Sequence, residues 1–144
     1  MSSNLESLYR QVIMDHYKNP RNKGLVDEEG YMTVHLNNPS CGDDINIQVK
    51  IVDDKVVDIR HQGIGCSICC SSASVMSETL KNKSVKEVKR ITNDFFEMLK
   101  GNEYDNTDLD EAEIYIGVSQ FPARIKCASL AWKALEKAVD NNEE

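Results

Sequence analysis

The hydrophobic pattern of this chain changes its period along the sequence, and this change limits the possible folds more than any other feature. Apolar and polar residues alternate strictly over residues 45–51, which read Ile-Asn-Ile-Gln-Val-Lys-Ile. Residues 31–37 and 55–62 have a similar short extended pattern, and Asp53-Asp54 provides a turn before the last of these segments. A period of two is typical of strands that bury one face, and short turns join neighbouring strands in antiparallel order. The pattern predicts a three-stranded antiparallel sheet with one solvated face.

Helical spacing appears before the strands. Apolar residues recur at intervals of three and four between Leu5 and Tyr17, and Asn19-Pro20 is a stop signal. This segment is predicted to be one helix.

Further helical segments follow the strands. The sequence after Gly65 predicts a helix over residues 68–82, and Ser84 with Glu87 forms a capping box that begins another. An acidic loop is expected over residues 102–113, and residues 114–118 are predicted to be a short helical or extended piece. Pro122 suits the first turn of a final amphipathic helix. The expected fold is α+β, with helices packed on one face of the sheet.

Length and charge restrict the class of protein. A chain of 144 residues is expected to form one domain over residues 1–144, with a core that needs neither metal nor disulfides. The formal charge of −7 argues against a general nucleic-acid binder, which needs a basic surface. The sequence contains no segment typical of a membrane span, a signal peptide or a transit peptide, so we expect a cytoplasmic protein.

Four residues stand where the sequence predicts turns or helix starts: Cys41, Asp43, Cys66 and Cys127. Thiols at helix starts are deprotonated more easily, and the thiolate is the form that binds metal or attacks sulfur. Because Gly42 separates Cys41 from Asp43, both side chains can turn toward one centre. Three thiolates and one carboxylate form a tetrahedral set that suits Zn²⁺. Separate buried cysteines that act as small hydrophobic residues are the alternative that spacing alone leaves open.

Three segments resemble the cysteine motifs of the IscU/SufU family: Asn38–Asp43, Gly63–Ile68 and Phe121–Cys127. Residues 8–22 are similar to the first helix of that family. The resemblance covers nearly the whole chain. It implies an α+β fold with the cysteines at one end of the sheet, and it implies that Cys41, Asp43, Cys66 and Cys127 are the metal ligands.

Two features resemble the SufU branch of this family. Lys126 stands where the scaffold branch has a histidine, and the acidic loop lengthens the stretch between the second and third cysteines. The SufU branch implies a bound zinc ion and sulfur transfer from a SufS-type cysteine desulfurase, with downstream Suf cluster-assembly proteins as further partners. A scaffold that binds a transient [2Fe-2S] cluster on the same residues is the alternative.

Arg124 lies three residues before Cys127, so both project from the same side of the predicted helix. Its guanidinium can form a two-pronged pair with a carboxylate. We hypothesise that Arg124 pairs with Asp43 during ligand exchange, and that Cys127 then accepts sulfur from a persulfide.

Other residue types with metal or redox chemistry are expected to be structural. Cys69 and Cys70 are predicted to be buried small side chains on a helix, although Cys66 and Cys69 have the spacing of a redox pair. The histidines, which are His16, His35 and His61, are predicted to be hydrogen-bonded structural residues. A redox protein and a purely structural zinc module remain as competing interpretations.

Overall fold

The computed structural model describes residues 2–40 and 42–143, and it describes the side chains of residues 6–40 and 42–141. Its elements, in chain order, are α1 (Ser2–Lys18), β1 (Tyr31–Asn38), β2 (Asp43–Val52), β3 (Lys55–Ile64), α2 (Ser67–Leu80), α3 (Val85–Lys100), the 3-10 helix η1 (Asp110–Val118) and α4 (Pro122–Glu143).

The three strands form one antiparallel sheet in the order β1-β2-β3, as the alternating pattern predicts. The inward side chains of β2, which include Ile45, Ile47 and Val49, are at most 2% exposed. In this register the start of β2 lies beside the end of β3, with Asp44 opposite Ile64. The sheet therefore brings the segment around Asp43 next to the segment that leads into α2.

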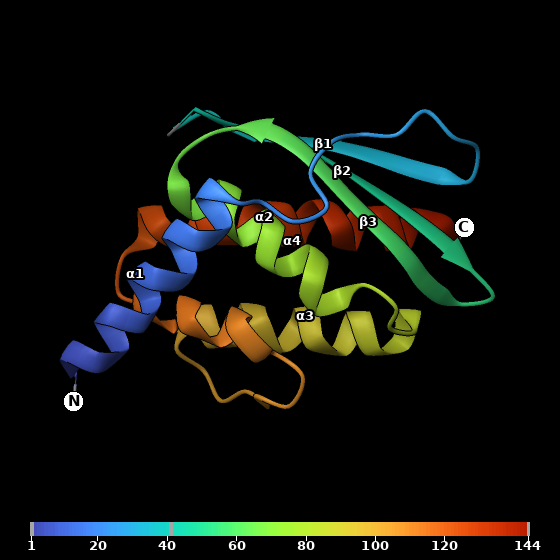
Figure 1. Cartoon of the computed structure of the whole chain (residues 1–144). Coiled ribbons are helices and arrows are strands. Elements are labelled where there is room, and N and C mark those ends of the chain that lie inside the picture. The colour runs from blue at the N-terminus through green and yellow to red at the C-terminus, as the bar shows by residue number, and fades with distance from the viewer. Residues whose placement is uncertain (1, 41, 144) are drawn as a thin grey trace.

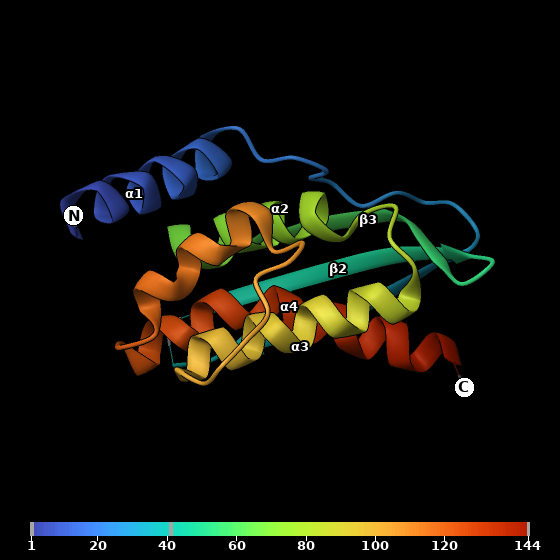
Figure 2. The ribbon, with the colours of Figure 1, turned by 90° about the horizontal axis from the view of Figure 1, so that it is seen from below.

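The helices cover one face of the sheet, which confirms the expected α+β architecture. Helix α4 packs against β1 and β2, and α2 packs against β3. Figures 1 and 2 show the sheet as one layer with α2 and α4 next to it on one side, while α1, α3 and η1 lie farther from the sheet on that side. The core between these layers is continuous and includes buried side chains from every helix and strand except β1, whose apolar residues are partly buried against it.

A buried polar contact fixes α4 against α2. The Trp132 side chain donates to Ser72 Oγ at 3.0 Å, and the Ser72 hydroxyl donates to the Ala128 carbonyl at 2.6 Å. The Trp132 ring also stacks on Phe95 of α3, with ring centroids 3.9 Å apart. These contacts set the position of the α4 turn that carries Cys127.

The ends of α3 follow the sequence signals. Ser84 and Glu87 form the predicted capping box, and Gly101 ends the helix in the left-handed conformation at φ 81°.

Two predicted boundaries were wrong. Helix α2 ends at Leu80 instead of residue 82, because Asn82 and Lys83 form backbone hydrogen bonds with Val56 at the edge of β3. The expected acidic loop is shorter than predicted, because η1 already begins at Asp110.

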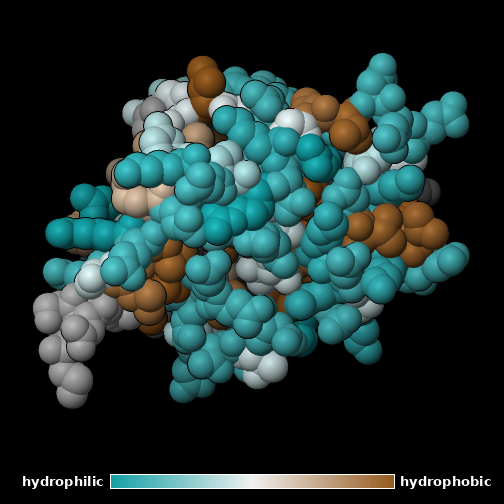
Figure 3. Space-filling model, viewed as in Figure 1, coloured by the Kyte–Doolittle hydropathy of each residue, from teal (hydrophilic) through white to brown (hydrophobic). Residues whose placement is uncertain are grey.

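Within the part of the chain that the structure describes, no helix is both long and apolar enough to cross a membrane. The face drawn in Figure 3 is mainly hydrophilic, and its hydrophobic side chains are exposed in small separate groups.

Candidate metal centre

The carboxylate of Asp43 is buried at one end of the sheet. Asp43 begins β2 and is only 1% exposed. Its Oδ1 accepts a hydrogen bond from the Cys66 amide at 3.0 Å, which joins the start of β2 to the start of α2. A carboxylate held in this way keeps a fixed direction toward the neighbouring sulfur atoms.

Cys66 is the N-cap of α2, as its place after Gly65 predicts. Its sulfur accepts a hydrogen bond from the Cys69 amide at 3.4 Å, and its backbone is extended. The positive end of a helix favours the thiolate over the thiol. Cys66 is more exposed than Asp43 and Cys127, which are 1% and 5% exposed.

Cys127, which is far from Asp43 and Cys66 in the sequence, lies beside them in the structure. It lies in the second turn of α4 and is 5% exposed. Asp43, Cys66 and Cys127 each offer one ligand atom, and these three atoms all lie within 4.8 Å of one another. Residues far apart in the sequence therefore meet at one point, as the metal prediction requires.

The donor set fits a zinc ion. Two sulfurs and one carboxylate oxygen within this distance can occupy three corners of a tetrahedron around Zn²⁺, after small side-chain adjustments. The fourth predicted ligand, Cys41, lies outside the described residues. The sequence places it two residues before Asp43.

Arg124 is exposed near this centre. Its guanidinium lies over the Phe121 ring, 4.6 Å from the centroid, and its charge also acts on the Tyr9 hydroxyl of α1. The contact with Phe121 places Arg124 close to the start of α4. Its predicted exchange with Asp43 stays a hypothesis.

Tyr9 is a residue near the site that the sequence pattern does not identify. Burial is the main cause that raises the pKa of the Tyr9 hydroxyl; the charge of Arg124 opposes this shift, and the charge of Cys66 adds to it. The Tyr9 ring lies directly against Gly117, where an added Cβ would be 3.2 Å from the ring. Helical periodicity shows only that Tyr9 faces inward, so no local signal identifies this contact.

Gly65 was also missed as a structural requirement of the site. A Cβ at this position would lie 2.5 Å from Asp43 Oδ1, which is closer than real side chains approach. The Gly63-Ile64-Gly65 motif was the available signal. Its second glycine leaves room for the carboxylate.

Cys69 and Cys70 lie close to Cys66 in the sequence but are not among the residues of the candidate metal centre. Cys69 is 1% exposed and belongs to the hydrophobic core, as predicted. The prediction that Cys70 is buried was wrong, because this residue is only partly buried. Burial still raises the pKa of its thiol, with a further contribution from Cys66. A high thiol pKa disfavours the thiolate.

All three histidines have hydrogen-bond partners, as predicted for structural residues. His16 bonds to Ser74 and Glu111, and His35 pairs with Asp44 on the exposed side of the sheet. His61 bonds to the Arg21 carbonyl, and burial lowers its pKa.

A small α+β fold with a buried carboxylate and two cysteine sulfurs at one end of its sheet is an arrangement that could hold a soft metal ion. The family model described as the NifU-like N terminal domain matches residues 8–128. The chain belongs to this family.

Similar proteins agree with this assignment and with the resemblance to the IscU/SufU family. The chain is 50% identical to the zinc-dependent sulfurtransferase SufU of Bacillus subtilis over 143 residues, which cover 99% of this chain and 96% of that protein. It is 44% identical to the iron-sulfur cluster assembly scaffold protein IscU of Streptococcus pyogenes, over 95% of this chain and 86% of the other.

A solved structure has the same fold. A crystal structure of a candidate iron-sulfur cluster assembly scaffold protein for the SUF system, from Fervidobacterium islandicum, superposes with a TM-score of 0.86 at 32% identity. The match covers 92% of this chain and 97% of that structure.

Proposed function

We propose that this protein is a zinc-dependent sulfur acceptor that takes persulfide sulfur from a SufS-type cysteine desulfurase and stimulates that enzyme for iron–sulfur cluster assembly. The observation that carries the proposal is the meeting of Asp43, Cys66 and Cys127 within 4.8 Å at the surface end of the sheet. The 50% identity to a zinc-dependent sulfurtransferase over nearly the full length supports the same reading.

Cys41, Asp43, Cys66 and Cys127 would hold the zinc ion. When bound, zinc stabilises cysteine sulfurs as thiolates at neutral pH. The remaining chemistry depends on how the residues of this chain place a thiolate beside an incoming persulfide. The Cys66 amide donates a hydrogen bond that orients Asp43, and Gly65 leaves room for its carboxylate. Phe121 contacts the Arg124 guanidinium, which lies three residues before Cys127.

The transfer step is a thiol–disulfide exchange. The thiolate of Cys127 attacks the terminal sulfur of the desulfurase persulfide, a new sulfur–sulfur bond forms on Cys127, and the old sulfur–sulfur bond breaks. The desulfurase cysteine leaves as a thiolate, so charge is conserved and no external oxidant or reductant is needed. Arg124 stabilises the Asp43 carboxylate while Cys127 is engaged.

Cys66 is the alternative sulfur acceptor, because its side chain is more accessible to solvent than that of Cys127. Cys127 is 5% exposed and must be uncovered when the partner docks, whereas Cys66 is already exposed. A partner that binds at this end of the sheet can displace exposed side chains such as Phe121, which is 47% exposed.

The test is to load the protein with sulfur from a SufS-type desulfurase and to locate the persulfide by mass spectrometry. We expect it on Cys127, with loss of sulfur loading in Cys127→Ser. A persulfide on Cys66 or Cys41 in the wild-type protein would instead assign the acceptor to that residue. Absence of any stimulation of the desulfurase would contradict the proposed function.

The second candidate function is a scaffold for a transient [2Fe-2S] cluster, favoured by the 44% identity to a protein named as a scaffold. The two functions predict different purified proteins. A sulfurtransferase is colourless and contains about one zinc ion per chain, whereas a scaffold is brown or takes up iron and sulfide readily. Asp43→Ala should lower zinc retention in the first case and make the cluster more persistent in the second.

A further inference from the structure

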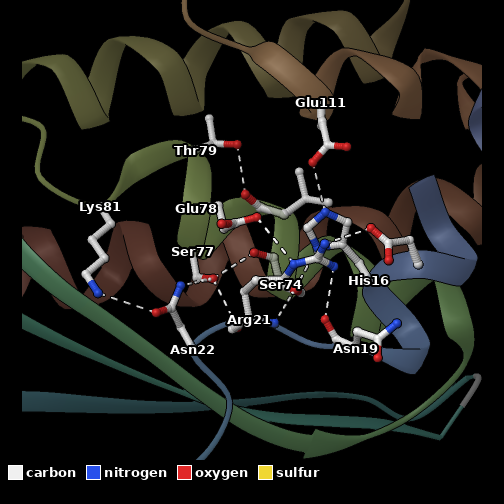
Figure 4. A network of polar contacts seen from close by, with 12 residues as sticks. His16, Asn19, Arg21, Asn22, Ser74, Ser77, Glu78, Thr79, Lys81 and Glu111 are labelled. Carbon is white, nitrogen blue, oxygen red and sulfur yellow. Dashed lines mark hydrogen bonds and ion pairs between the residues drawn. The ribbon is translucent and has the colours of Figure 1, made fainter.

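A second group of metal-binding residue types lies apart from the thiolate centre. His16 of α1, Glu78 of α2 and Glu111 of η1 each offer one ligand atom, and these atoms all lie within 4.8 Å of one another. Figure 4 shows the three side chains converging from separate elements, with Arg21 and Ser74 beside them. None of the three belongs to the cysteine motifs.

The buried member of this group is His16, whose side chain is 0% exposed. Its Nδ1 lies 2.7 Å from Ser74 Oγ, and its Nε2 lies 2.9 Å from Glu111 Oε1. Ser74 Oγ also accepts the Arg21 amide at 2.8 Å. A hydroxyl can donate to His16 or accept from it, so the site accommodates both neutral tautomers of the ring.

One of these tautomers can bind a cation. If Nδ1 carries the proton and donates to Ser74, then the lone pair of Nε2 faces the Glu111 carboxylate and is available to a metal ion. In the other tautomer, Nε2 donates its proton to Glu111 and no ion is needed. A histidine whose second nitrogen is fixed by a hydrogen bond is the usual arrangement of a metal ligand.

The carboxylates are placed to admit an ion from solvent. The Glu111 side chain is 52% exposed, and that of Glu78 is 49% exposed. Arg21 is the competing cation, but its contact with Glu78 is long, at 3.6 Å, whereas its contact with Asp15 is 2.7 Å. Arg21 therefore keeps its stronger partner when Glu78 turns to a metal ion.

We propose that His16, Glu78 and Glu111 form a second binding site for a divalent transition-metal ion such as Zn²⁺, distinct from the thiolate centre. One imidazole nitrogen and two carboxylate oxygens suit such ions, and water completes the coordination. Ligand atoms on a tetrahedral zinc ion with bonds of about 2.0–2.1 Å lie roughly 3.3 Å apart. The three ligand atoms of this group already lie within 4.8 Å of one another. The ion would join α1 to α2 and η1.

Cobalt distinguishes the two sites in the zinc-loaded protein. Co²⁺ at a nitrogen and oxygen site gives weak visible bands, without the intense near-ultraviolet charge-transfer bands of cobalt thiolates. We expect one further equivalent of Co²⁺ to bind saturably with weak bands only. The double variant Glu78→Gln/Glu111→Gln should lower this affinity at least tenfold while the zinc content of the thiolate centre stays unchanged.

Glu113→Gln is the matched control. Glu113 also lies in η1, but its carboxylate accepts from the Tyr104 hydroxyl at 2.8 Å instead of facing His16. Its variant should bind Co²⁺ as the wild type does. Circular dichroism verifies that the glutamine variants are folded, and Mn²⁺ should broaden the NMR signals of the His16 ring in the wild-type protein.

The proposal is overturned if Co²⁺ binding is not saturable, or if the double variant binds as tightly as the wild type. It is also overturned if Mn²⁺ leaves the His16 signals sharp. In each case His16 is only hydrogen-bonded to Glu111, and Glu78 only contacts Arg21.

Discussion

At the scale of single residues, Gly65 tests whether the close packing around Asp43 matters. We predict that Gly65→Ala displaces the Asp43 carboxylate, because the new Cβ would lie 2.5 Å from Oδ1. The expected result is a loss of zinc affinity of about 10–100-fold, the range found when groups that orient metal ligands are disturbed. The measurement is zinc competition with a chromogenic chelator.

Ile64→Ala is the control for this substitution. Ile64 is the preceding residue and is 73% exposed, so its truncation leaves the Asp43 contact in place. Equal zinc affinity in wild type and Gly65→Ala would mean that Asp43 is not positioned by this contact.

A residue pair across the sheet gives a pH-dependent prediction. The Tyr31 hydroxyl of β1 donates to Asp58 of β3 at 2.5 Å, and this bond raises the pKa of Tyr31 to about 12. The pKa of Asp58 is lowered, because bonds from Tyr31 and Lys81 outweigh the effect of burial. A carboxyl group with a lowered pKa stabilises the fold at pH values above its unfolded pKa and loses this contribution as the pH falls through its folded pKa.

We therefore predict that Tyr31→Phe lowers the free energy of unfolding by about 1.5–3 kcal/mol at pH 7, the usual contribution of a hydrogen bond to a charged group. The difference from wild type should shrink as the pH falls through the acidic range in which Asp58 becomes protonated. Urea unfolding at several pH values measures both effects. A difference that is the same at every pH would show that the bond does not depend on the Asp58 charge.

At the scale of elements, the contact between α2 and α4 links stability to the metal centre. Ser72→Ala leaves the buried Trp132 Nε1 group without its acceptor, which costs about 1–3 kcal/mol. Because Ser72 also bonds to Ala128, the residue after Cys127, we predict that this variant weakens zinc retention as well.

Ser84→Ala separates these two effects. It removes the N-cap of α3 and should cost about 1 kcal/mol of stability, but α3 carries none of the proposed ligands. Chemical unfolding and zinc competition on both variants give the comparison. If Ser84→Ala weakens zinc binding as much as Ser72→Ala does, general destabilisation explains the loss.

The elements also show how far the sequence predicts this molecule. Strands and amphipathic helices were predictable, because apolar residues recur in the sequence with periods of two and 3.6. The capping box at Ser84 also predicted the start of α3 correctly. The end of α2 was not predictable, because Asn82 leaves the helix to bond with Val56 of β3, a contact between distant segments.

In the candidate metal centre, too, some residues were predictable from the sequence and others were not. The position of Cys66 followed from a helix-start signal, whereas Asp43, which was expected in a turn, is the first residue of β2. The family resemblance grouped both residues with Cys127. Tyr9 could not be assigned to the site, because its closeness to Arg124 and Cys66 depends on how α1 packs beside η1. Local patterns report which face is buried, but tertiary packing decides which polar groups meet.

At the scale of the whole molecule, we propose that residues 1–144 form a single domain whose fold does not depend on the metal. The core draws buried apolar side chains from both strands β2 and β3 and from all the helices, so most of it lies away from the thiolate centre. Removal of zinc by a chelator should therefore leave the far-ultraviolet circular dichroism nearly unchanged and lower the melting temperature only moderately. Complete unfolding on chelation would support a structural zinc module instead.

The coordination of the bound metal tests the central claim most directly. X-ray absorption at the zinc edge of the protein purified from cells should show one zinc ion with three sulfur ligands at about 2.3 Å and one oxygen ligand at about 2.0 Å. Asp43→Ala should change the oxygen contribution while the sulfur contribution remains. A purified protein that contains iron and sulfide in place of zinc, or zinc without sulfur ligands, would contradict the account.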